Sequence, residues 1–323
     1  MTQIVDAFYQ ALITNQSVHD FLAADVKWGA SHPINDLSGA EQVVSAYWQP
    51  LKAALPDIER KPLISVEEEV DGSLWVCETG YFVGTFTAPL FGIPASGRTL
   101  YLRYTEMTSV AQGKIQESYV ILDFLDVMNQ VGVNPIRESL GHAGIIPAPA
   151  TQDGLSRPDA TPEQGEKTVS LVNDMLAELG RFDGKSLESM KLENYWHPDF
   201  MWYGPAGIGT TRGINGFRQH HQGPFVFAFP DRSIDHHVAT LKSGNYAATG
   251  GWPHMHGTHS GPHWLGLAPT NKNINLRVMD IWRREGDLLV ENWVGIDIIH
   301  MLYQLGLDVF AQMRLLSGPG QES

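Results

Sequence analysis

The chain has 323 residues, of which 43% are hydrophobic and 18% are charged, a composition typical of soluble globular proteins. Its 22 Lys and Arg against 36 Asp and Glu give a formal net charge of −14, which argues against nucleic-acid binding and against an anionic membrane surface. No apolar run approaches the roughly 20 residues of a membrane span, and the single cysteine, Cys77, excludes an internal disulfide or a multi-cysteine metal site.

The N-terminal stretch "MTQIVDAFYQALITNQSVHDF" lacks the basic segment, apolar core and small-residue cleavage site of an export signal. Together with the single cysteine, this pattern favours a reducing compartment, so we expect a cytoplasmic protein. The length favours two domains of ordinary size.

The two halves of the chain resemble each other at an offset of 174 residues, which indicates an internal duplication. The matched pairs are Phe8 with Phe182, Asp25 with Asp199, Trp28 with Trp202, Gly39 with Gly213, Pro50 with Pro224, Pro56-Asp57 with Pro230-Asp231, Arg103 with Arg277, Glu106 with Asp280, Glu117 with Glu291 and Asp123 with Asp297. One position slips between them, where "VGTF" lies against "HGTH". We therefore predict an N-terminal domain over residues 1–145 and a homologous C-terminal domain over 161–323. Residues 146–160, in a stretch rich in Pro and Gly, form the predicted linker.

The elements of the second half begin with an amphipathic helix that starts at Thr161-Pro162 and ends before Gly180. A short helix near 186–192, a brief strand in "DFMWYG" and a helix-like segment over 213–221 follow. Segments rich in Val, Ile, Trp and Thr then predict an antiparallel meander over 232–242, 246–259, 274–284 and 287–299. Helices followed by a curled antiparallel sheet are typical of an α+β domain.

The second half also carries the motifs "FPDRSID", "GTHSGPHWLGLAPTNK" and "RREGDLLVENWVGIDIIHMLYQLG". These motifs resemble the SnoaL-like polyketide cyclase family of the NTF2-like superfamily, although Asn271 replaces a glycine of the expected turn. The first half departs further, with Phe86 in place of the motif histidine. The resemblance implies two tandem cone-shaped α+β folds related as an intramolecular pseudo-dimer. The resemblance is less informative about the reaction than about the fold, because cyclases, isomerases, dehydratases, epoxide hydrolases and non-enzymatic binders share this scaffold.

Acidic residues near the C-terminus are the candidate acid/base groups. Antiparallel pairing about the turn at 284–287 predicts Asp280 opposite Glu291, and alternation puts Glu291, Trp293 and Asp297 on one face. Like charges beside an apolar wall raise the pKa of at least one carboxyl toward neutrality. In the resembled cyclases an aspartate at the position of Asp297 is the acid/base, so we expect Asp297 to be catalytic, with Asp280 as a further candidate. The alternatives are an Arg-paired or solvated Asp297 and an architectural role for Asp280 and Glu291.

Histidines crowd the stretch "WPHMHGTH", where alternation places Trp252, His254 and His256 on one face and a bulge at Gly257 can add His259. Such a cluster can hold zinc or iron, but it lacks the carboxylate of a cupin motif, and the resembled cyclases need no metal. We therefore expect no metal and no cofactor. His254 and His256 are expected to hydrogen-bond ligand oxygens, with His259 as a catalytic partner of Asp297.

Aromatic side chains are numerous enough to wall a pocket for a flat ligand, although core packing is the alternative for each of them. The candidate ligand contacts are Trp202, Trp252, Trp264, Trp293, His220, His221 and Glu291. The first half has no equivalents of His254 and His256, so we expect a degenerate pocket there and an active pocket in the second half.

These patterns predict a cofactor-independent acid/base enzyme that acts on a small hydrophobic or aromatic carbonyl compound by aldol-type cyclisation, isomerisation or dehydration. The alternatives are a non-catalytic small-molecule binding protein and a His-ligated metalloenzyme. The expected partner is the small ligand, with neither nucleic acid nor a membrane, and a homodimer of the whole chain stays open.

Overall fold

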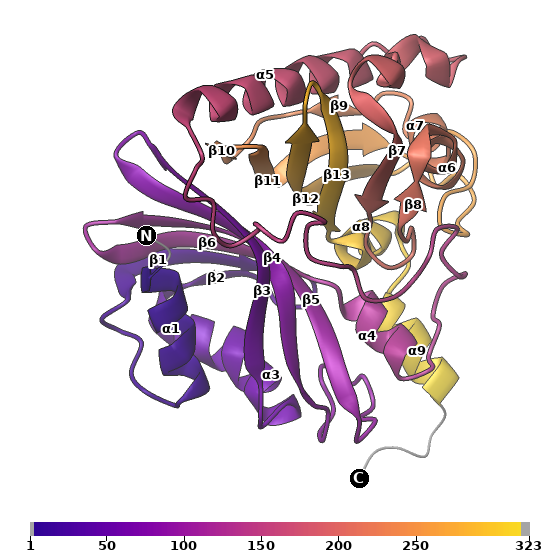
Figure 1. Cartoon of the computed structure of the whole chain (residues 1–323). Helices are drawn as coiled ribbons and strands as arrows, with labels where there is room; N and C mark the ends of the chain where they lie inside the picture. Colours follow the sequence, from indigo (N-terminus) through magenta and orange to yellow (C-terminus); the bar gives the residue numbers. More distant parts are fainter. Residues whose placement is uncertain (1–2, 318–323) are drawn as a thin grey trace.

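The computed structural model describes residues 3–317 and folds each half of the chain into a curved, mostly antiparallel sheet with helices on one face (Figure 1). The N-terminal sheet has the order β2-β1-β6-β5-β4-β3, and the C-terminal sheet has the order β10-β11-β12-β13-β7-β8, with β9 paired to β11. The same arrangement in both halves confirms the two tandem α+β folds.

In the N-terminal half, helical segments precede the four long strands. The elements are α1 (Gln3–Ile13), β1 (Leu22–Ala30), β2 (Asn35–Ser38), α2 (Gly39–Gln42), a π-helical turn (Val43–Trp48), α3 (Gln49–Ala54), β3 (Glu59–Val70), β4 (Ser73–Thr85), β5 (Thr99–Ala111), β6 (Lys114–Leu122) and α4 (Phe124–Gln130).

The C-terminal half repeats this sequence of elements. They are α5 (Pro162–Leu179), two 3-10 turns (Leu187–Met190 and Leu192–Asn194), β7 (Trp196–Tyr203), β8 (Thr211–Arg212), α6 (Gly213–Phe217), a π-helical turn (Arg218–Gln222), α7 (Gly223–Ala228), β9 (Ser233–Ile234), β10 (Ala239–Ser243), β11 (Tyr246–Thr258), β12 (Asn273–Glu285), β13 (Leu288–Ile296), α8 (Ile298–Leu305) and α9 (Val309–Ser317).

Local sequence signals set the ends of α5, and the predicted helix is confirmed. The Thr161 side chain accepts a hydrogen bond from the backbone N–H of Gln164, and the Gln164 side chain accepts one from the backbone of Thr161. This capping box satisfies two N–H groups that the helix leaves free. Pro162 occupies the first turn, where its missing N–H costs nothing.

The segment 232–242 differs from its predicted single strand, because it is divided into β9 and β10. Both strands pair with β11, but the register of β11 shifts between Gly251 and Met255. A bulged strand bends, and the partner alongside it is interrupted at the same place.

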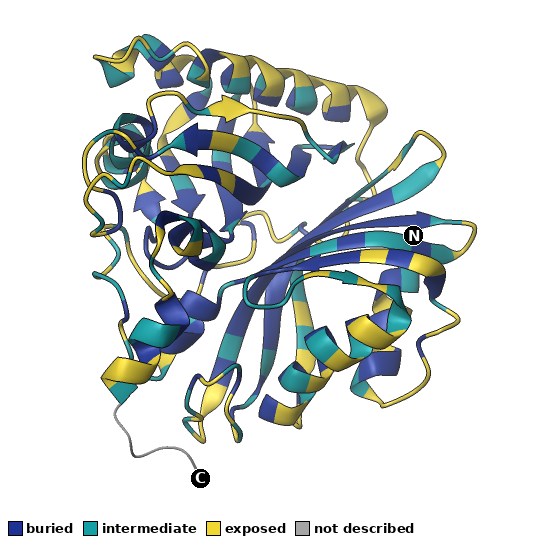
Figure 2. Cartoon of the chain, turned by 180° about the vertical axis from the view of Figure 1, so that it is seen from behind, coloured by how far each residue is buried: buried dark blue, intermediate teal, exposed yellow. Residues whose placement is uncertain are grey.

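The outer faces of the two sheets pack against each other and bury apolar side chains from both halves. This junction contains Ile64, Val66, Trp75, Cys77, Tyr81, Met107, Ile121, Tyr203, Leu241, Tyr246, Ala248, Met279, Ile281 and Trp293. Figure 2 shows the strands that meet here as mostly buried. Because neighbouring residues of a strand point to opposite faces, the junction also fixes which side chains face the helices.

Matched polar residues reinforce the junction in both directions. Asp123 caps α4 and accepts a hydrogen bond from the backbone of Ala206, at 2.8 Å, in the other half. Asp297 caps α8 and accepts one from the backbone of His32, at 3.0 Å, in the first half. Ala206 and His32 differ by the same 174 positions as the two aspartates, so the junction has approximate twofold symmetry.

Two buried arginines, Arg103 and Arg277, also bridge the halves. Arg103 donates to the backbone carbonyls of Tyr203, Gly204 and Val294 at 2.8–2.9 Å. These carbonyls lie away from water, so the guanidinium group is the donor that satisfies them.

Segments that follow α4 and α8 cross to the opposite half. Ser139 accepts a hydrogen bond from the backbone of Gly207, and His142 forms a bridge with Thr210. In the other direction α9 lies beside α4, with the rings of Phe310 and Phe124 6.4 Å apart (Figure 1). Each half is therefore covered in part by the tail of the other.

The residues between the halves are bonded to both of them. The backbone N–H of Ile146 donates to the hydroxyl of Tyr81, and the carbonyl of Pro147 accepts from the Trp293 indole at 3.1 Å. The connecting segment therefore follows the junction.

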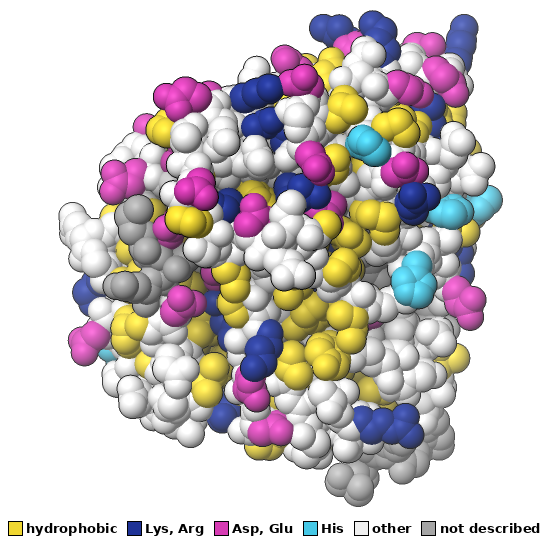
Figure 3. Space-filling view, viewed as in Figure 1, with side chains coloured by type: hydrophobic (Ala, Val, Ile, Leu, Met, Phe, Trp, Pro, Cys, Tyr) yellow, Lys and Arg dark blue, Asp and Glu magenta, His cyan; other side chains and the backbone are white. Residues whose placement is uncertain are grey.

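Charged side chains of both signs are interspersed over the face shown in Figure 3, without a broad basic area. Within residues 3–317, no helix has both the length and the apolar character needed to cross a membrane.

We predict that Arg103→Met lowers the free energy of unfolding by about 3–5 kcal/mol, because three buried carbonyls lose their charged donor. Urea unfolding followed by tryptophan fluorescence measures this change. The exposed Arg98 is the matched control, and Arg98→Met is expected to change stability by less than about 0.5 kcal/mol. Equal effects of the two substitutions would refute a bridging role for Arg103.

Candidate active site

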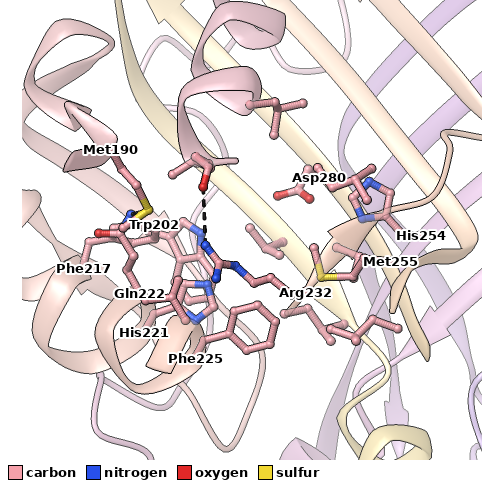
Figure 4. A pocket seen from close by; sticks show the side chains of 18 of the residues that line it. Met190, Trp202, Phe217, His221, Gln222, Phe225, Arg232, His254, Met255 and Asp280 are labelled. Atoms are coloured by element: carbon pink, nitrogen blue, oxygen red, sulfur yellow. Dashed lines mark hydrogen bonds between the residues drawn. The ribbon is translucent and has the colours of Figure 1, made fainter. Parts of the chain in front are cut away.

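A cavity of about 380 Å³ lies in the C-terminal half, between the inner face of the sheet and the helices that cover it (Figure 4). Its wall is mostly apolar and aromatic, and includes Met175, Leu176, Leu179, Leu192, Trp196, Trp202, Phe217, Phe225, Trp264, Val278, Trp282, Val294 and Ile296. The polar side chains at the wall are His221, Gln222, Arg232, Ser233, His254, Asp280 and Asn292. An apolar enclosure with a few polar groups is the usual form of a small-molecule site.

Asp280 is the only acidic side chain among the residues of this wall. It projects from β12, and the side chain of Asn292 on β13 donates to its carboxylate at 3.1 Å. Within the described part of the chain, this is the only hydrogen bond of the Asp280 carboxylate. Burial among apolar groups raises the pKa of Asp280 to about 7, although the bond from Asn292 opposes the rise. The carboxyl group is therefore ionised in about half of the molecules at neutral pH.

The matched residue of the N-terminal half, Glu106, has a different environment. Its carboxylate lies 3.0 Å from the guanidinium of Arg60 and accepts hydrogen bonds from Tyr9 and Ser118, each at 3.0 Å. Thr108 donates to it as well, at 3.1 Å. Glu106 is thus bonded on all sides by its own half, whereas Asp280 faces an open cavity.

The positions that match the cavity wall are also filled differently in the first half. Tyr47 and Trp48 stand where the second half has His221 and Gln222, and both are buried in the N-terminal core. The Tyr47 hydroxyl lies 3.1 Å from that of Tyr9, in the region of Glu106. Large aromatic side chains therefore occupy the space that remains open in the second half.

His221 forms part of the aromatic wall. Its ring stacks on Trp202, with centroids 4.1 Å apart and an interplanar angle of 16°. Burial lowers the pKa of His221 to about 3, so the imidazole is neutral at physiological pH. No described side chain or backbone group forms a hydrogen bond with its ring. His220, the neighbouring candidate, does not line the cavity.

His254 also reaches the cavity, and Nε2 of its ring lies 3.1 Å from Nδ1 of His237. Burial and the adjacent His237 lower the pKa of His254 to about 4, and its Nδ1 has no hydrogen-bond partner within residues 3–317. Among residues 3–317, no group of three His, Cys, Asp or Glu side chains is arranged to hold a metal ion.

The predicted shared face of Trp252, His254 and His256 is wrong, because β11 loses its regular alternation between Gly251 and Met255. The Trp252 ring turns toward the first half, where its indole donates to Asp36 at 2.7 Å. His256 is exposed and lies 2.5 Å from Asp235.

His259 is buried and stacks on Phe229, and its Nε2 lies 3.3 Å from the carbonyl of Pro262. It anchors the loop that carries Trp264 and does not line the cavity. The expected catalytic contact between His259 and Asp297 is therefore absent among the described contacts.

The predicted pairing of Asp280 with Glu291 is also wrong, because Asp280 pairs with Val294. The hairpin turns at Gly286 and Asp287, and Val290 bulges out of the ladder between the paired residues on either side.

This register sends Glu291 and Trp293 into the junction and away from the cavity. Glu291 accepts hydrogen bonds from Arg283, at 2.5 Å, and from Tyr203, at 3.2 Å. The Trp293 ring packs 5.2 Å from the Tyr203 ring. Neither side chain is available to a ligand in the cavity.

Asp297 lies outside the cavity wall as well. It is buried in the junction, 3.1 Å from the guanidinium of Arg277, which matches the Arg-paired alternative considered from the sequence. Of the predicted site residues, the structure gathers Asp280, His221, His254, Trp202 and Trp264 around one cavity.

The sequence reasoning missed four polar wall residues: Gln222, Arg232, Ser233 and Asn292. Asn292 follows from the correct hairpin register, which brings it beside Asp280. Arg232 follows directly after the Pro230-Asp231 motif, and this adjacency was the available signal.

Comparisons with known proteins agree with this architecture. The family model described as SnoaL-like polyketide cyclase matches residues 3–131 and 182–305, which together make up more than half of the chain. No curated protein matches the chain.

Several solved structures are similar to parts of the chain. Wild-type IdmH from Streptomyces antibioticus is 26% identical, with 42% of this chain and 98% of that chain covered and a TM-score of 0.32. TsrD from Streptomyces laurentii is 23% identical, with 44% and 96% covered and a TM-score of 0.33. An NTF2-like protein from Burkholderia xenovorans is 16% identical, with 44% and 98% covered and a TM-score of 0.35.

We predict that Asp280→Asn stabilises the fold at pH 8. A pKa raised from 3.8 to about 7 means that ionised Asp280 opposes folding, by ~4 kcal/mol once both states are ionised. This cost is fully present above pH 7 and disappears as the pH falls toward 4. Chemical unfolding at pH 8 and pH 4 tests the sign, and the stabilisation is expected only at pH 8.

The matched control is Glu106→Gln in the first half. Burial raises the pKa of Glu106 as well, although the Arg60 guanidinium opposes the rise, so the expected difference comes from the ion pair: Gln cannot keep the buried pair with Arg60, and breaking it is expected to destabilise the fold at pH 8. If both substitutions shifted stability in the same direction, the contrast between the two carboxyl environments would be wrong.

Proposed function

Because the chain belongs to the SnoaL-like polyketide cyclase family, we propose that its C-terminal half is a cofactor-independent acid/base enzyme for a small hydrophobic carbonyl compound. Family membership supports a cyclase- or isomerase-type role in general. The reactions that we propose are aldol-type cyclisation, isomerisation and dehydration. The observation that carries this proposal is Asp280, a carboxyl group that faces an apolar cavity and has no ionic partner among the residues that the structure describes.

The proposed reaction begins with Asp280 as a carboxylate, which takes a proton from a carbon beside the substrate carbonyl. The electron pair of that C–H bond moves into an enolate. In a cyclisation, the enolate carbon attacks a second carbonyl carbon of the same molecule, and the new alkoxide takes the proton back from Asp280. A pKa of about 7 suits both transfers, because neither protonation state is strongly favoured at neutral pH.

The cavity supports this chemistry in two further ways. Its aromatic wall, with the His221 ring stacked on Trp202, suits a flat substrate. A neutral imidazole N–H from His221 or His254 can donate to the oxygen that gains charge in the enolate. Both rings remain neutral near pH 7, because burial lowers the pKa values of His221 and His254 to about 3 and about 4.

The proposal assigns the chemistry to the second half alone, because Glu106 in the first half is already bonded to Arg60 and to hydroxyl groups. Asp297 is assigned to the junction and takes no part in proton transfer. A cytoplasmic location fits the single buried thiol of Cys77. The proposed partner is the small carbonyl ligand.

We predict that Asp280→Asn lowers the rate of proton abstraction by at least about 100-fold. The measurement is the loss of deuterium from α-deuterated 2-tetralone in water, followed by NMR. Asp297→Asn is the matched control and is expected to lower stability while the rate per folded molecule stays near that of the wild type. If the wild-type protein bound 2-tetralone without accelerating exchange, the binding-protein alternative would replace this proposal.

The same reaction should depend on pH through Asp280. Since the base must be ionised, kcat/KM is expected to rise as the pH increases through about 7 and to level off above it. At pH 5 only ~1% of Asp280 is ionised, so the rate should be about 100-fold below the plateau. A profile that stays flat between pH 5 and pH 8 would exclude Asp280 as the base.

A further inference from the structure

We infer that Arg232 is an anion-binding residue of the cavity and that the substrate carries a carboxylate group in addition to its hydrophobic carbonyl part. This inference rests on the proposed function, because it takes the cavity as the substrate site. It adds a charge requirement to the proposed substrate class.

Arg232 is half-buried and belongs to the cavity wall. Figure 4 shows its side chain extending among the labelled wall residues, toward Trp202 and His221. Asp280 lines the same cavity. A ligand that fills the cavity can therefore meet a cationic group and an acid/base carboxyl group on the same molecule.

The charge of Arg232 has no anionic partner among residues 3–317. Its one hydrogen bond runs from Nη2 to the backbone carbonyl of Leu179 at 3.4 Å, and its guanidinium lies 5.5 Å from the centre of the Phe182 ring. Burial lowers the pKa of Arg232, and no neighbouring carboxylate opposes that effect. A half-buried cation is costly unless an anion accompanies it, and a guanidinium group matches a carboxylate with two parallel hydrogen bonds.

Several other partly or fully buried arginines of this chain are paired with a carboxylate. Arg277 lies 3.1 Å from Asp297, Arg283 lies 2.5 Å from Glu291, and Arg218 lies 2.7 Å from Glu193. Arg103, Arg157 and Arg284 have no carboxylate partner, but each donates at least three hydrogen bonds to oxygen atoms, whereas Arg232 donates one. The anion that pairs with Arg232 would therefore be a carboxylate of the ligand.

The duplication shows that the fold itself does not need a cation at this position. Asp57 and Asp231 form the same turn, since each accepts hydrogen bonds from the backbone and hydroxyl of one threonine, Thr85 or Thr258. The next residue is Ile58 in the first half, where it belongs to the core, and Arg232 in the second. An apolar side chain therefore serves the architecture, and the arginine occurs in the half with the open cavity.

Two further polar atoms of the wall also lack partners. Oε1 of Gln222 and Nδ1 of His254 are buried and form no hydrogen bond with any group of the described chain. Buried polar atoms are seldom left unsatisfied, so they also indicate a ligand with polar groups. A purely hydrocarbon ligand would leave the Arg232 guanidinium without an anion and these two atoms without hydrogen bonds.

The experiment compares two probes of the same shape, 2-naphthoate and its neutral analogue 2-naphthamide, by isothermal titration calorimetry at pH 7.5. We expect the wild-type protein to bind 2-naphthoate at least tenfold more tightly. Arg232→Met should abolish this preference while its affinity for 2-naphthamide stays within about twofold, and Arg232→Lys should keep part of it.

The matched control is Arg181→Met, which removes an exposed arginine close to α5 that is paired with Glu178 and does not line the cavity. This variant should keep the full preference, because long-range attraction is screened. Thermal unfolding of each variant verifies that it is folded. The inference is overturned if wild-type protein binds both probes equally or binds neither, or if Arg232→Met retains the preference.

Binding and turnover are measured separately, so the two proposals can fail separately. Wild-type protein that shows normal deuterium exchange but no preference for 2-naphthoate over 2-naphthamide would reject the role of Arg232 alone. Preference for naphthoate without any deuterium exchange would reject the acid/base function and leave a binding protein for aromatic carboxylates.

Discussion

The direction of each side chain in the cavity follows from the packing of the two sheets against each other. The junction contains Met279 and Ile281 of β12 and Trp293 of β13. Because neighbouring residues of a strand point to opposite faces, Asp280 and Asn292 face the cavity. The helices of each half cover that face and enclose the cavity. The chemistry of the second half therefore depends on apolar contacts with the first.

The two halves have used the same acidic position in opposite ways. In the first, Glu106 is bonded to Arg60 and to surrounding hydroxyl groups, and the pocket is filled with aromatic side chains. In the second, Asp280 keeps one hydrogen bond and faces open space. A buried carboxyl group with a single neutral hydrogen-bond donor reduces stability when it is ionised, but it retains the ability to exchange protons. The first half contributes stability to a molecule whose second half contains a costly site.

The sequence predicted the duplication, the fold and the capped start of α5, because these depend on residue identity and local spacing. It did not predict the register of the last hairpin, where the bulge at Val290 and the two-residue turn moved Glu291 and Trp293 to the other face. The irregularity between Gly251 and Met255 separated Trp252 from His254 in the same way. A shift of one residue reverses the face of a side chain, and a single sequence carries little information about such shifts. Asp280 was recognised as a candidate, but its partner Asn292 could not be found without that register.

The tails that cross between the halves have a consequence for how such a pair can evolve. Because α9 packs on the first half while the segment after α4 packs on the second, neither half keeps its surface covered alone. A covalent connection also holds the partners at a high effective concentration, so the association cannot be lost by dilution. A separate subunit that lost its active site would compete with intact copies for partners. Inside one chain, the copy with the filled interior is always matched to a copy with an open cavity, and it is free to specialise as a permanent support.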